Sequence, residues 1–227
     1  LNRYEDAYIY LQKIKEVRPA TLDDRLKIHR QYYTSKFRLS IDTGNFEEGV
    51  RDLEEHFAEI KKFDASLFEG SSFYFQYFYI YFGAERYEDA LHYLNLWLNR
   101  PKSNERQDLQ AIARILQLLI HYEIGNMLLL ESIIRSTYRY LKNHNSLFAA
   151  ERRILAFMQK ASKIHAATDL QQPLLRLREE LQHLAQQPKE KAMLRLFDID
   201  AWLESKISKQ TFAEIIRQKY EQTKAAR

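Results

Sequence analysis

The sequence predicts an all-α protein, an array of antiparallel helix pairs closed by a C-terminal helical cap. Of its 227 residues only 5 are Gly and 4 are Pro. Because both residues weaken helix interiors, their scarcity favours long helices joined by short loops. A short phrase also recurs four times along the chain at an even spacing. Apolar residues follow it at helical intervals, as in Tyr87, Leu91, Leu94 and Leu98, which is the pattern of one buried helix face.

The recurring phrase defines the repeat. Its string Arg-Tyr-Glu-Asp-Ala occurs twice unchanged and twice in related form, at residues 3–7, 86–90, 45–49 and 126–130. Near its start each copy has an aromatic ring or a thioether, and these residues are Tyr4, Phe46, Tyr87 and Met127. Their spacings are 42, 41 and 40 residues. Such an even period predicts a stack of similar units, each of which buries its apolar face on the next.

Each phrase is expected to begin the second helix of a unit. Two acids follow the ring in three of the copies, and the free N–H groups at a helix N-terminus favour negative charge. Gly44 and Gly125 stand just before the phrase, where the end of the preceding helix needs a left-handed residue. The predicted unit is therefore a helix, a tight turn and a second helix.

The same signals place eleven helices along the chain. They are expected at residues 4–17, 22–42, 46–63, 71–83, 87–99, 105–123, 128–142, 147–164, 169–186, 189–206 and 209–223. Thr21 with Asp24 resembles a capping box at the start of the second helix. Phe73 to Phe82 holds eight aromatic residues in ten, a composition that suits a strand. The repeat nevertheless places this segment in the first helix of its unit.

Two of the phrases resemble the inter-helix turn of the tetratricopeptide repeat (TPR) family. Residues 44–50 and 86–91 follow its pattern of Gly, Asp or Asn, an aromatic residue, two acids, Ala and an aliphatic residue. The resemblance covers roughly residues 1–145. It implies a right-handed α-α superhelix that binds a protein or peptide on the surface lined by first helices, without catalysis. The chain is also similar to uncharacterised bacterial TPR-containing proteins around residues 106–110 and 202–206.

Two features depart from the family. The repeat is longer than the family's unit of about 34 residues. Midway along the first helix, where the family has a small residue, this chain has Phe37, Phe78 and Leu118. Because large side chains push paired helices apart or change their crossing angle, we expect the superhelix to differ from a regular TPR spiral.

A narrow polar stripe marks the predicted binding surface. In the helix expected at 105–123, Gln110, Arg114, Gln117 and His121 recur at spacings of 4, 3 and 4 between apolar flanks. This is the pattern of a helix packed on both sides and open along one line. The equivalent positions in neighbouring units include Tyr33, Lys36, Tyr74, Tyr77, Tyr81 and Arg152. Tyr and Arg are frequent binding anchors, so we expect this ladder to contact a peptide with acidic or amide groups and some aromatic content.

Two alternatives remain for the stripe. One is that it forms only the solvated face that every amphipathic helix has. The other is that the groove lies about one position round the helix, since a strict overlay on the TPR pattern places Phe75, Tyr79 and Phe82 there.

The sequence carries no pattern typical of an enzyme or a metal site. It has no Cys, and its 7 His show neither zinc-ligand spacing nor an HExxH motif. Neither a Gly-rich phosphate loop nor a nucleophile elbow occurs. Asp198 and Asp200 are two residues apart and so do not share a helix face. We therefore expect no enzyme activity, catalytic residue, metal or cofactor.

The runner-up prediction is an RNA- or DNA-associated regulatory or accessory protein. It rests on a basic cluster interleaved with rings, which can contact phosphates and stack on bases. The cluster consists of Arg25, Lys27, Arg30, Tyr32, Tyr33, Lys36, Phe37 and Arg38. The net charge of the chain is only +4, whereas nucleic-acid binders usually carry a denser basic stripe. A protein or peptide is therefore the favoured partner.

The predicted organisation is a repeat region at 1–166 and a cap at 167–227. The cap contains a leucine stripe that either packs on the last repeat or forms a dimer seam, which predicts a monomer or a weak dimer. The stripe consists of Leu170, Leu174, Leu177, Leu181 and Leu184. Trp202 and Phe212 are expected to anchor the cap in the core.

No apolar run reaches the roughly 18 residues that a membrane span needs. The lack of Cys suits a reducing compartment, so a cytoplasmic location is expected. The chain opens at Leu1, within a repeat unit, and we expect an N-terminal portion to precede it.

Overall fold

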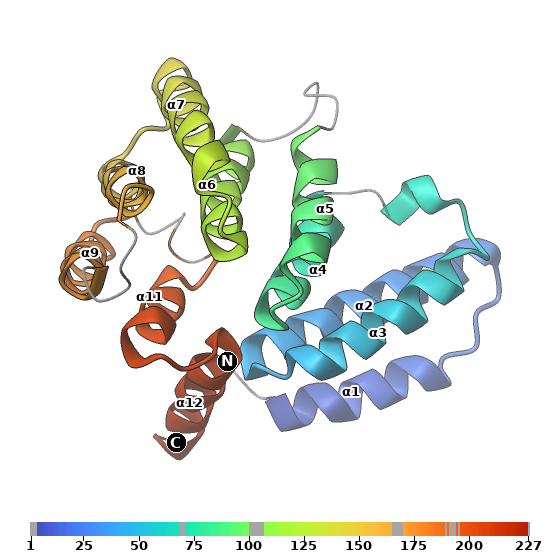
Figure 1. Cartoon of the computed structure of the whole chain (residues 1–227). Coiled ribbons are helices and arrows are strands. Elements are labelled where there is room, and N and C mark those ends of the chain that lie inside the picture. Colours follow the sequence, from blue (N-terminus) through green and yellow to red (C-terminus); the bar gives the residue numbers. More distant parts are fainter. Residues whose placement is uncertain are drawn as a thin grey trace.

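The computed structural model describes residues 4–68, 71–99, 107–164, 170–188, 190, 194 and 196–226. Within these residues the chain is helical and contains no strand, which confirms the all-α prediction (Figure 1). The helices are α1 (Tyr4–Glu16), α2 (Leu22–Thr43), α3 (Phe46–Ile60), the short 3-10 helix η1 (Ala65–Phe68), α4 (Ser71–Gly83), α5 (Tyr87–Leu98), α6 (Gln107–Ile124), α7 (Met127–Asn143), α8 (Ala149–Ala161), α9 (Gln171–Leu184), α11 (Ile199–Ser208) and α12 (Phe212–Ala225). The predicted boundary at 166 and 167 lies outside the described residues.

Local signals set the ends of the helices. At the start of α2 the hydroxyl of Thr21 accepts from the amide of Asp24, and the Asp24 carboxylate accepts from the amide of Thr21, both at 3.1 Å. Gly44 and Gly125 follow α2 and α6 with φ of 73° and 80°, the left-handed conformation that glycine adopts at no steric cost. The predicted capping box and the two predicted glycine stops are confirmed.

One predicted helix is wrong. The sequence pattern suggested a single helix at 189–206, but α11 begins only at Ile199. The carboxylate of Asp198 accepts from the amide of Ala201 at 2.8 Å and so caps α11. Because a separate helix begins at Ile199, the chain bends at Phe197 and Asp198, and this bend faces the repeat region.

Consecutive helices pack on one another along the chain. Helix α2 contacts α1 and α3, α5 contacts α4 and α6, and α8 contacts α7 and α9. The first helices of neighbouring units also touch, because α2 packs on α4 and α6 packs on α8. These contacts form one continuous row of helices (Figure 1).

Helix α4 lies at the centre of the core, which explains its many aromatic residues. It packs on α2, α3 and α5, and Phe197 and Phe212 cover its remaining side. Phe78, Ile80 and Phe82 are at most 1% exposed. A helix that is apolar all round has to be enclosed on every side, so the prediction of a helix rather than a strand is confirmed here.

The C-terminal helices fold back onto the beginning of the array. Helix α12 contacts α2, and Figure 1 shows it beside the ends of α2 and α3. The rings of Phe197 and Phe212 stack at 5.5 Å. Both rings also contact Tyr79 and Phe82, with centroids 4.9 to 6.0 Å apart. Arg217 donates from Nε to the carbonyl oxygen of Gly44 at 3.1 Å.

The predicted anchors of the cap are buried. Trp202 is 1% exposed and Phe212 is 3% exposed, as expected. The indole of Trp202 donates to Glu123 at 2.6 Å, and Lys206 binds the other oxygen of the same carboxylate at 2.7 Å. These contacts attach α11 to the end of α6.

The leucine stripe of α9 packs inside the chain. Four of its members are 3 to 8% exposed, namely Leu170, Leu174, Leu177 and Leu181. Helix α9 packs on α8 and α11, so the stripe is a packing face within the protein. Among the described residues, no helix combines the length and the hydropathy that crossing a membrane would require.

We predict that Gly83→Ala destabilises the protein, although the same change usually stabilises a helix by about 0.5–1 kcal/mol. A Cβ added at Gly83 would lie 2.4 Å from ring atoms of Phe46, which is 1% exposed. Since this ring is enclosed, we expect a loss of about 1–3 kcal/mol in urea unfolding followed by circular dichroism. Gly49→Ala, whose Cβ would meet Ile80 at 3.0 Å, should cost less. A Gly83→Ala variant as stable as the parent would contradict this packing.

Candidate functional site

The predicted ladder runs mostly through the interior of the array. Six of its members are 2 to 8% exposed, namely Tyr33, Tyr74, Tyr77, Tyr81, Gln110 and His121. Lys36, Arg114 and Gln117 are half-buried, and Arg152 is exposed. The six buried side chains are core residues in this structure, so they do not form a solvated face. Contact of the ladder with a partner stays a prediction, and four members are accessible in this structure.

The stripe is buried because the second helix of the same unit and that of the preceding unit cover it. On α4, the ring of Tyr77 lies 5.1 Å from Phe57 of α3 and 5.1 Å from Tyr93 of α5. Tyr81 stacks on Tyr93 at 5.6 Å. The hydroxyl groups of these tyrosines suggested an exposed stripe in the sequence, but in the structure they lie inside the core.

A chain of polar groups runs from the surface to Tyr77. The carboxylate of Glu59 lies 3.2 Å from Nδ1 of His29. Nε2 of His29 is 3.0 Å from Nδ1 of His56, and Nε2 of His56 is 2.6 Å from the hydroxyl of Tyr77. Burial, together with the smaller effect of the neighbouring His29, lowers the pKa of His56 to about 3. Burial also lowers the pKa of His29, with Glu59 opposing that shift.

The half-buried members of the ladder join helices in pairs. Lys36 forms an ion pair with Asp52 of α3, and burial raises the pKa of that carboxyl although Lys36 counteracts the shift. The guanidinium of Arg114 lies 4.1 Å from the ring centre of Tyr140. The structure does not bring these side chains together into one site.

A groove lies instead on the side of α2 and α4 that faces the C-terminal helices. We call it the inner groove; its volume is about 650 Å³. Phe75 and Tyr79, two of the three residues that the strict TPR overlay selected, line it. The third, Phe82, is covered by Phe197 and Phe212. The volume falls within the range of sites that bind small ligands or peptide side chains.

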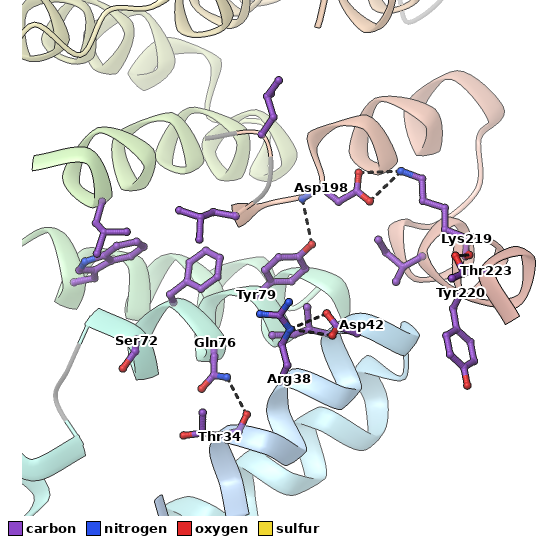
Figure 2. Close-up of a pocket in the computed structure, with 17 residues that line it drawn as sticks. Thr34, Arg38, Asp42, Ser72, Gln76, Tyr79, Asp198, Lys219, Tyr220 and Thr223 are labelled. Carbon is purple, nitrogen blue, oxygen red and sulfur yellow. Dashed lines mark hydrogen bonds and ion pairs between the residues drawn. The ribbon is translucent and has the colours of Figure 1, made fainter. Parts of the chain in front are cut away.

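Two walls with different origins enclose the inner groove. Figure 2 shows Arg38 and Asp42 of α2 and Tyr79 of α4 on one side, and Asp198 and Lys219 of the C-terminal region on the other. Apolar lining comes from Ile41, Phe75, Trp97, Leu109, Leu196 and Ile216. Residues separated by most of the chain therefore meet at this site.

Ion pairs fix the charged side chains of the groove. Arg38 Nε donates to both carboxylate oxygens of Asp42 at 2.9 and 3.0 Å. Burial raises the pKa of Asp42, with Arg38 opposing the shift. On the other wall Lys219 lies 2.9 Å from Asp198. The amide of Asp198 donates to the hydroxyl of Tyr79 at 3.2 Å and so connects the two walls.

A second carboxylate strengthens the C-terminal wall. Lys219 also binds Asp200 at 3.0 Å, and Arg178 of α9 binds the same carboxylate at 2.8 Å. Burial opposes ionisation of Asp200, but hydrogen bonds from Arg178, Lys219 and Gln182 outweigh it and hold the pKa well below its usual range. Helices α9, α11 and α12 are thereby tied together behind the groove.

Two buried polar atoms of groove residues have no hydrogen-bond partner among the described residues. They are the indole Nε1 of Trp97, a side chain only 1% exposed, and Oε1 of Gln76. The amide nitrogen of Gln76 already donates to the carbonyl oxygen of Thr34 at 3.1 Å (Figure 2). Buried polar atoms are nearly always paired in native proteins. Trp97 and Gln76 thus bring one unpaired donor and one unpaired acceptor to the wall of the groove, and an occupant reaches them only when the side chains that cover them move.

Sequence reasoning found part of this site. The TPR overlay indicated Phe75 and Tyr79, whereas the sequence pattern assigned Asp198 no role beyond excluding it, with Asp200, as a pair on one helix face. Asp198 does cap α11, but its contact with Tyr79 joins residues 119 positions apart. No local pattern reports a contact at that separation.

No cluster of three or more metal-ligating side chains occurs in the part of the chain that the structure describes. Comparison with models of known families, with curated proteins and with solved structures gives no match to this chain.

The buried histidines predict a loss of stability on acidification. A His with a folded-state pKa below 6.5 binds its proton more weakly than the unfolded chain does, so its stabilisation is present above pH 6.5 and is lost as the pH falls. We expect His56 to lower the free energy of unfolding by about 1 kcal/mol per pH unit between pH 6 and 4.5. Glu151, whose pKa burial raises to about 7, acts in the opposite direction over the same range.

His56→Phe should be less stable at pH 7.5, because it leaves His29 and Tyr77 without their partner, and should show a shallower slope below pH 6. His183→Gln, a change at an exposed histidine of α9, serves as the control and should keep the parent slope. Urea unfolding at several pH values measures both quantities. Equal slopes for His56→Phe and the parent would show that His56 is not the titrating group.

Proposed function

We propose that this chain is a non-enzymatic interaction module that binds a peptide segment of a partner protein in the inner groove. In this proposal the helix pairs form a TPR-like right-handed superhelix, and its first helices α2 and α4 present the binding surface. The proposal rests on one observation: the groove is lined by Trp97 and Gln76, whose buried donor Nε1 and buried acceptor Oε1 have no partner among the residues that the structure describes.

A peptide suits this pair of groups. Each peptide unit supplies one N–H donor and one C=O acceptor, which are the two complements that Gln76 and Trp97 need. Leaving a buried donor or acceptor unsatisfied costs about 1–3 kcal/mol, so an occupant that satisfies both gains affinity. Phe75 and Ile216 provide the apolar surface on which a side chain of the peptide can be buried.

The charges of the groove favour an uncharged peptide segment. Arg38 is paired with Asp42, and Lys219 is paired with Asp198, so each cation is matched by a carboxylate. An occupant with a net charge would have to break one of these pairs. The same pairing engages the titratable side chains in structural contacts, which supports binding rather than proton transfer.

The nucleic-acid alternative has weaker support. Three cations of the predicted basic cluster pair with carboxylates, namely Lys27 with Asp23, Lys36 with Asp52 and Arg38 with Asp42. The rings interleaved with them, Tyr32, Tyr33 and Phe37, are at most 7% exposed. Stacking on bases requires open rings, so this surface is less suited to RNA than the inner groove is to a peptide.

The proposed setting is the bacterial cytoplasm. The absence of Cys from the sequence suits a reducing compartment, and the TPR resemblance extends to bacterial proteins. A monomer is proposed because the leucine stripe of α9 is used within the chain.

Selection from a library of random 12-residue peptides, displayed on phage, tests the proposed function. Peptides enriched on the parent protein should bind Gln76→Ala about 3- to 10-fold more weakly in fluorescence anisotropy, because one hydrogen bond of about 0.5–1.5 kcal/mol is lost. Trp97→Phe should weaken binding by a similar factor. Gln31→Ala, the same change at an exposed position of α2, should leave the affinity unchanged.

A bulky side chain at the rim provides an independent arm of the test. Thr223 lines the groove and is exposed, so Thr223→Trp should fold normally and obstruct entry, with at least a tenfold loss of affinity. A library that yields no peptide sensitive to Gln76→Ala or Thr223→Trp would contradict the proposal.

A further inference from the structure

A second groove lies between α7 and α8 and shares no lining residue with the inner groove. We call it the α7–α8 groove; its volume is about 700 Å³. Figure 1 shows these two helices as neighbours at the far end of the array from α1. The lining of the α7–α8 groove includes Arg152, the exposed member of the predicted ladder. It also includes Ala156 and Gln159, which follow Arg152 at the spacing of the polar stripe.

The edges of the α7–α8 groove are cationic. Arg135, Arg139 and Lys142 line it from α7, and Arg152 lines it from α8. Among the described lining residues there is no carboxylate. Positive charge thus stands on both sides of the groove, although the whole chain has a net charge of only +4.

Most of this positive charge is not neutralised within the protein. Arg139 and Lys142 form no ion pair in the part of the chain that the structure describes, and both are exposed. Arg135 is 3.9 Å from Glu131 with 68% of its side chain exposed, a geometry that contributes little energy. Arg152 donates to the carbonyl oxygen of Leu147 at 3.1 and 3.3 Å, which holds its guanidinium at the edge without removing its charge.

The floor of the groove is apolar. Ile134 is 8% exposed and Leu155 is 5% exposed, and the small side chain of Ala156 leaves room above them. Tyr138 stands at the edge with 47% of its surface exposed. Leu128, seven residues before Arg135 and so on the same helix face, is 97% exposed. Apolar surface therefore continues along the α7 side beyond the cavity.

The length of the groove matches a short helix. A smaller cavity lined by Glu131, Arg135, Gln159 and Lys163 extends it toward the beginning of α7. From Glu131 to Lys142 the α7 wall covers eleven residue steps, which is about 16 Å at 1.5 Å per residue. Three turns of an α-helix have this length.

We propose that the α7–α8 groove binds an acidic amphipathic helix of a partner protein. Apolar side chains spaced three and four residues apart would enter the floor formed by Ile134 and Leu155, as in other helix-in-groove complexes. Glu or Asp residues on the flank of that helix that faces α7 would pair with Arg135, Arg139 and Lys142, and an acid on the other flank would pair with Arg152. Such charge complementarity sets orientation and excludes other partners.

The floor distinguishes this occupant from a nucleic acid. RNA and DNA present charge along their backbones and need rings on which bases stack, but Tyr138 is the one aromatic side chain that lines the groove among the described residues. An apolar channel with three cations on its α7 side and Arg152 on its α8 side matches a helix that has one apolar face and acidic flanks. This inference does not depend on the inner groove, so either proposal can fail alone.

The test uses a fluorescein-labelled 16-residue peptide with Leu at helical i, i+3, i+4 and i+7 positions and Glu on both flanks. A peptide with the same composition in scrambled order is the control for amphipathic pattern. We expect the parent protein to bind the patterned peptide at least tenfold more tightly than the scrambled one in fluorescence anisotropy. Equal affinity for the two peptides would overturn the proposal.

Charge reversal locates the binding surface. The double variant Arg139→Glu with Lys142→Glu should bind the patterned peptide at least tenfold more weakly. Arg51→Glu with Lys61→Glu changes the net charge by the same amount at exposed positions of the α3 region and should bind within twofold of the parent. Circular dichroism melting confirms that both variants fold. Equal effects of the two double variants would overturn the assignment to this groove.

A steric variant separates the helix from RNA. Ala156→Tyr should fill the channel and weaken the patterned peptide at least fivefold, because the apolar floor is then covered. A single-stranded 20-nucleotide RNA of random sequence should bind the parent more weakly than the peptide does at 150 mM salt. Tighter RNA binding that is lost on Arg139→Glu with Lys142→Glu but kept in Ala156→Tyr would identify a nucleic-acid surface and overturn the proposal.

Discussion

The packing of the C-terminal helices onto the aromatic face of α4 is the contact on which the rest of the structure depends. Phe197 and Phe212 stack at 5.5 Å and cover Tyr79 and Phe82. Without them, α4 would expose large aromatic surface to water, and aromatic side chains dominate the energetics of a core. The same contact gives the inner groove its second wall, so the stability of the core and the shape of the groove have one cause.

The closure combines apolar burial with a small number of specific polar contacts. Arg217 holds the end of α2 through the carbonyl of Gly44, and Lys219 gathers the carboxylates of Asp198 and Asp200. Burial supplies energy without direction, whereas these bonds fix the register in which α12 meets α2. A groove whose two walls are held together in this way loses less conformational entropy on binding, which supports the proposed role of the inner groove in recognition.

The sequence predicted where the helices begin and end better than it predicted which of their residues are exposed. The capping box at Thr21 and the glycine stop at Gly44 depend on neighbours within a few residues, so their patterns could be read directly. The break at Asp198 depends in part on Tyr79, which lies 119 residues away. The repeat identified equivalent positions in successive helices, yet Tyr77 and Tyr81 are covered by α3 and α5 while Arg152 is open. The repeat period alone gives the position of a residue on its helix, whereas the neighbouring helices determine whether that residue is exposed.

Native-state hydrogen exchange tests the closure most directly. If α12 is an integral part of the core, the amides of residues 215–219 should exchange with the same free energy as those of residues 77–81 in α4, in one cooperative opening. Phe212→Ala should lower both values together, since it removes a ring of α12 that contacts Tyr79 and Phe82 of α4. Rapid exchange along α12 while α4 keeps full protection in the parent protein would show that the C-terminal helices are detached, and would contradict this account.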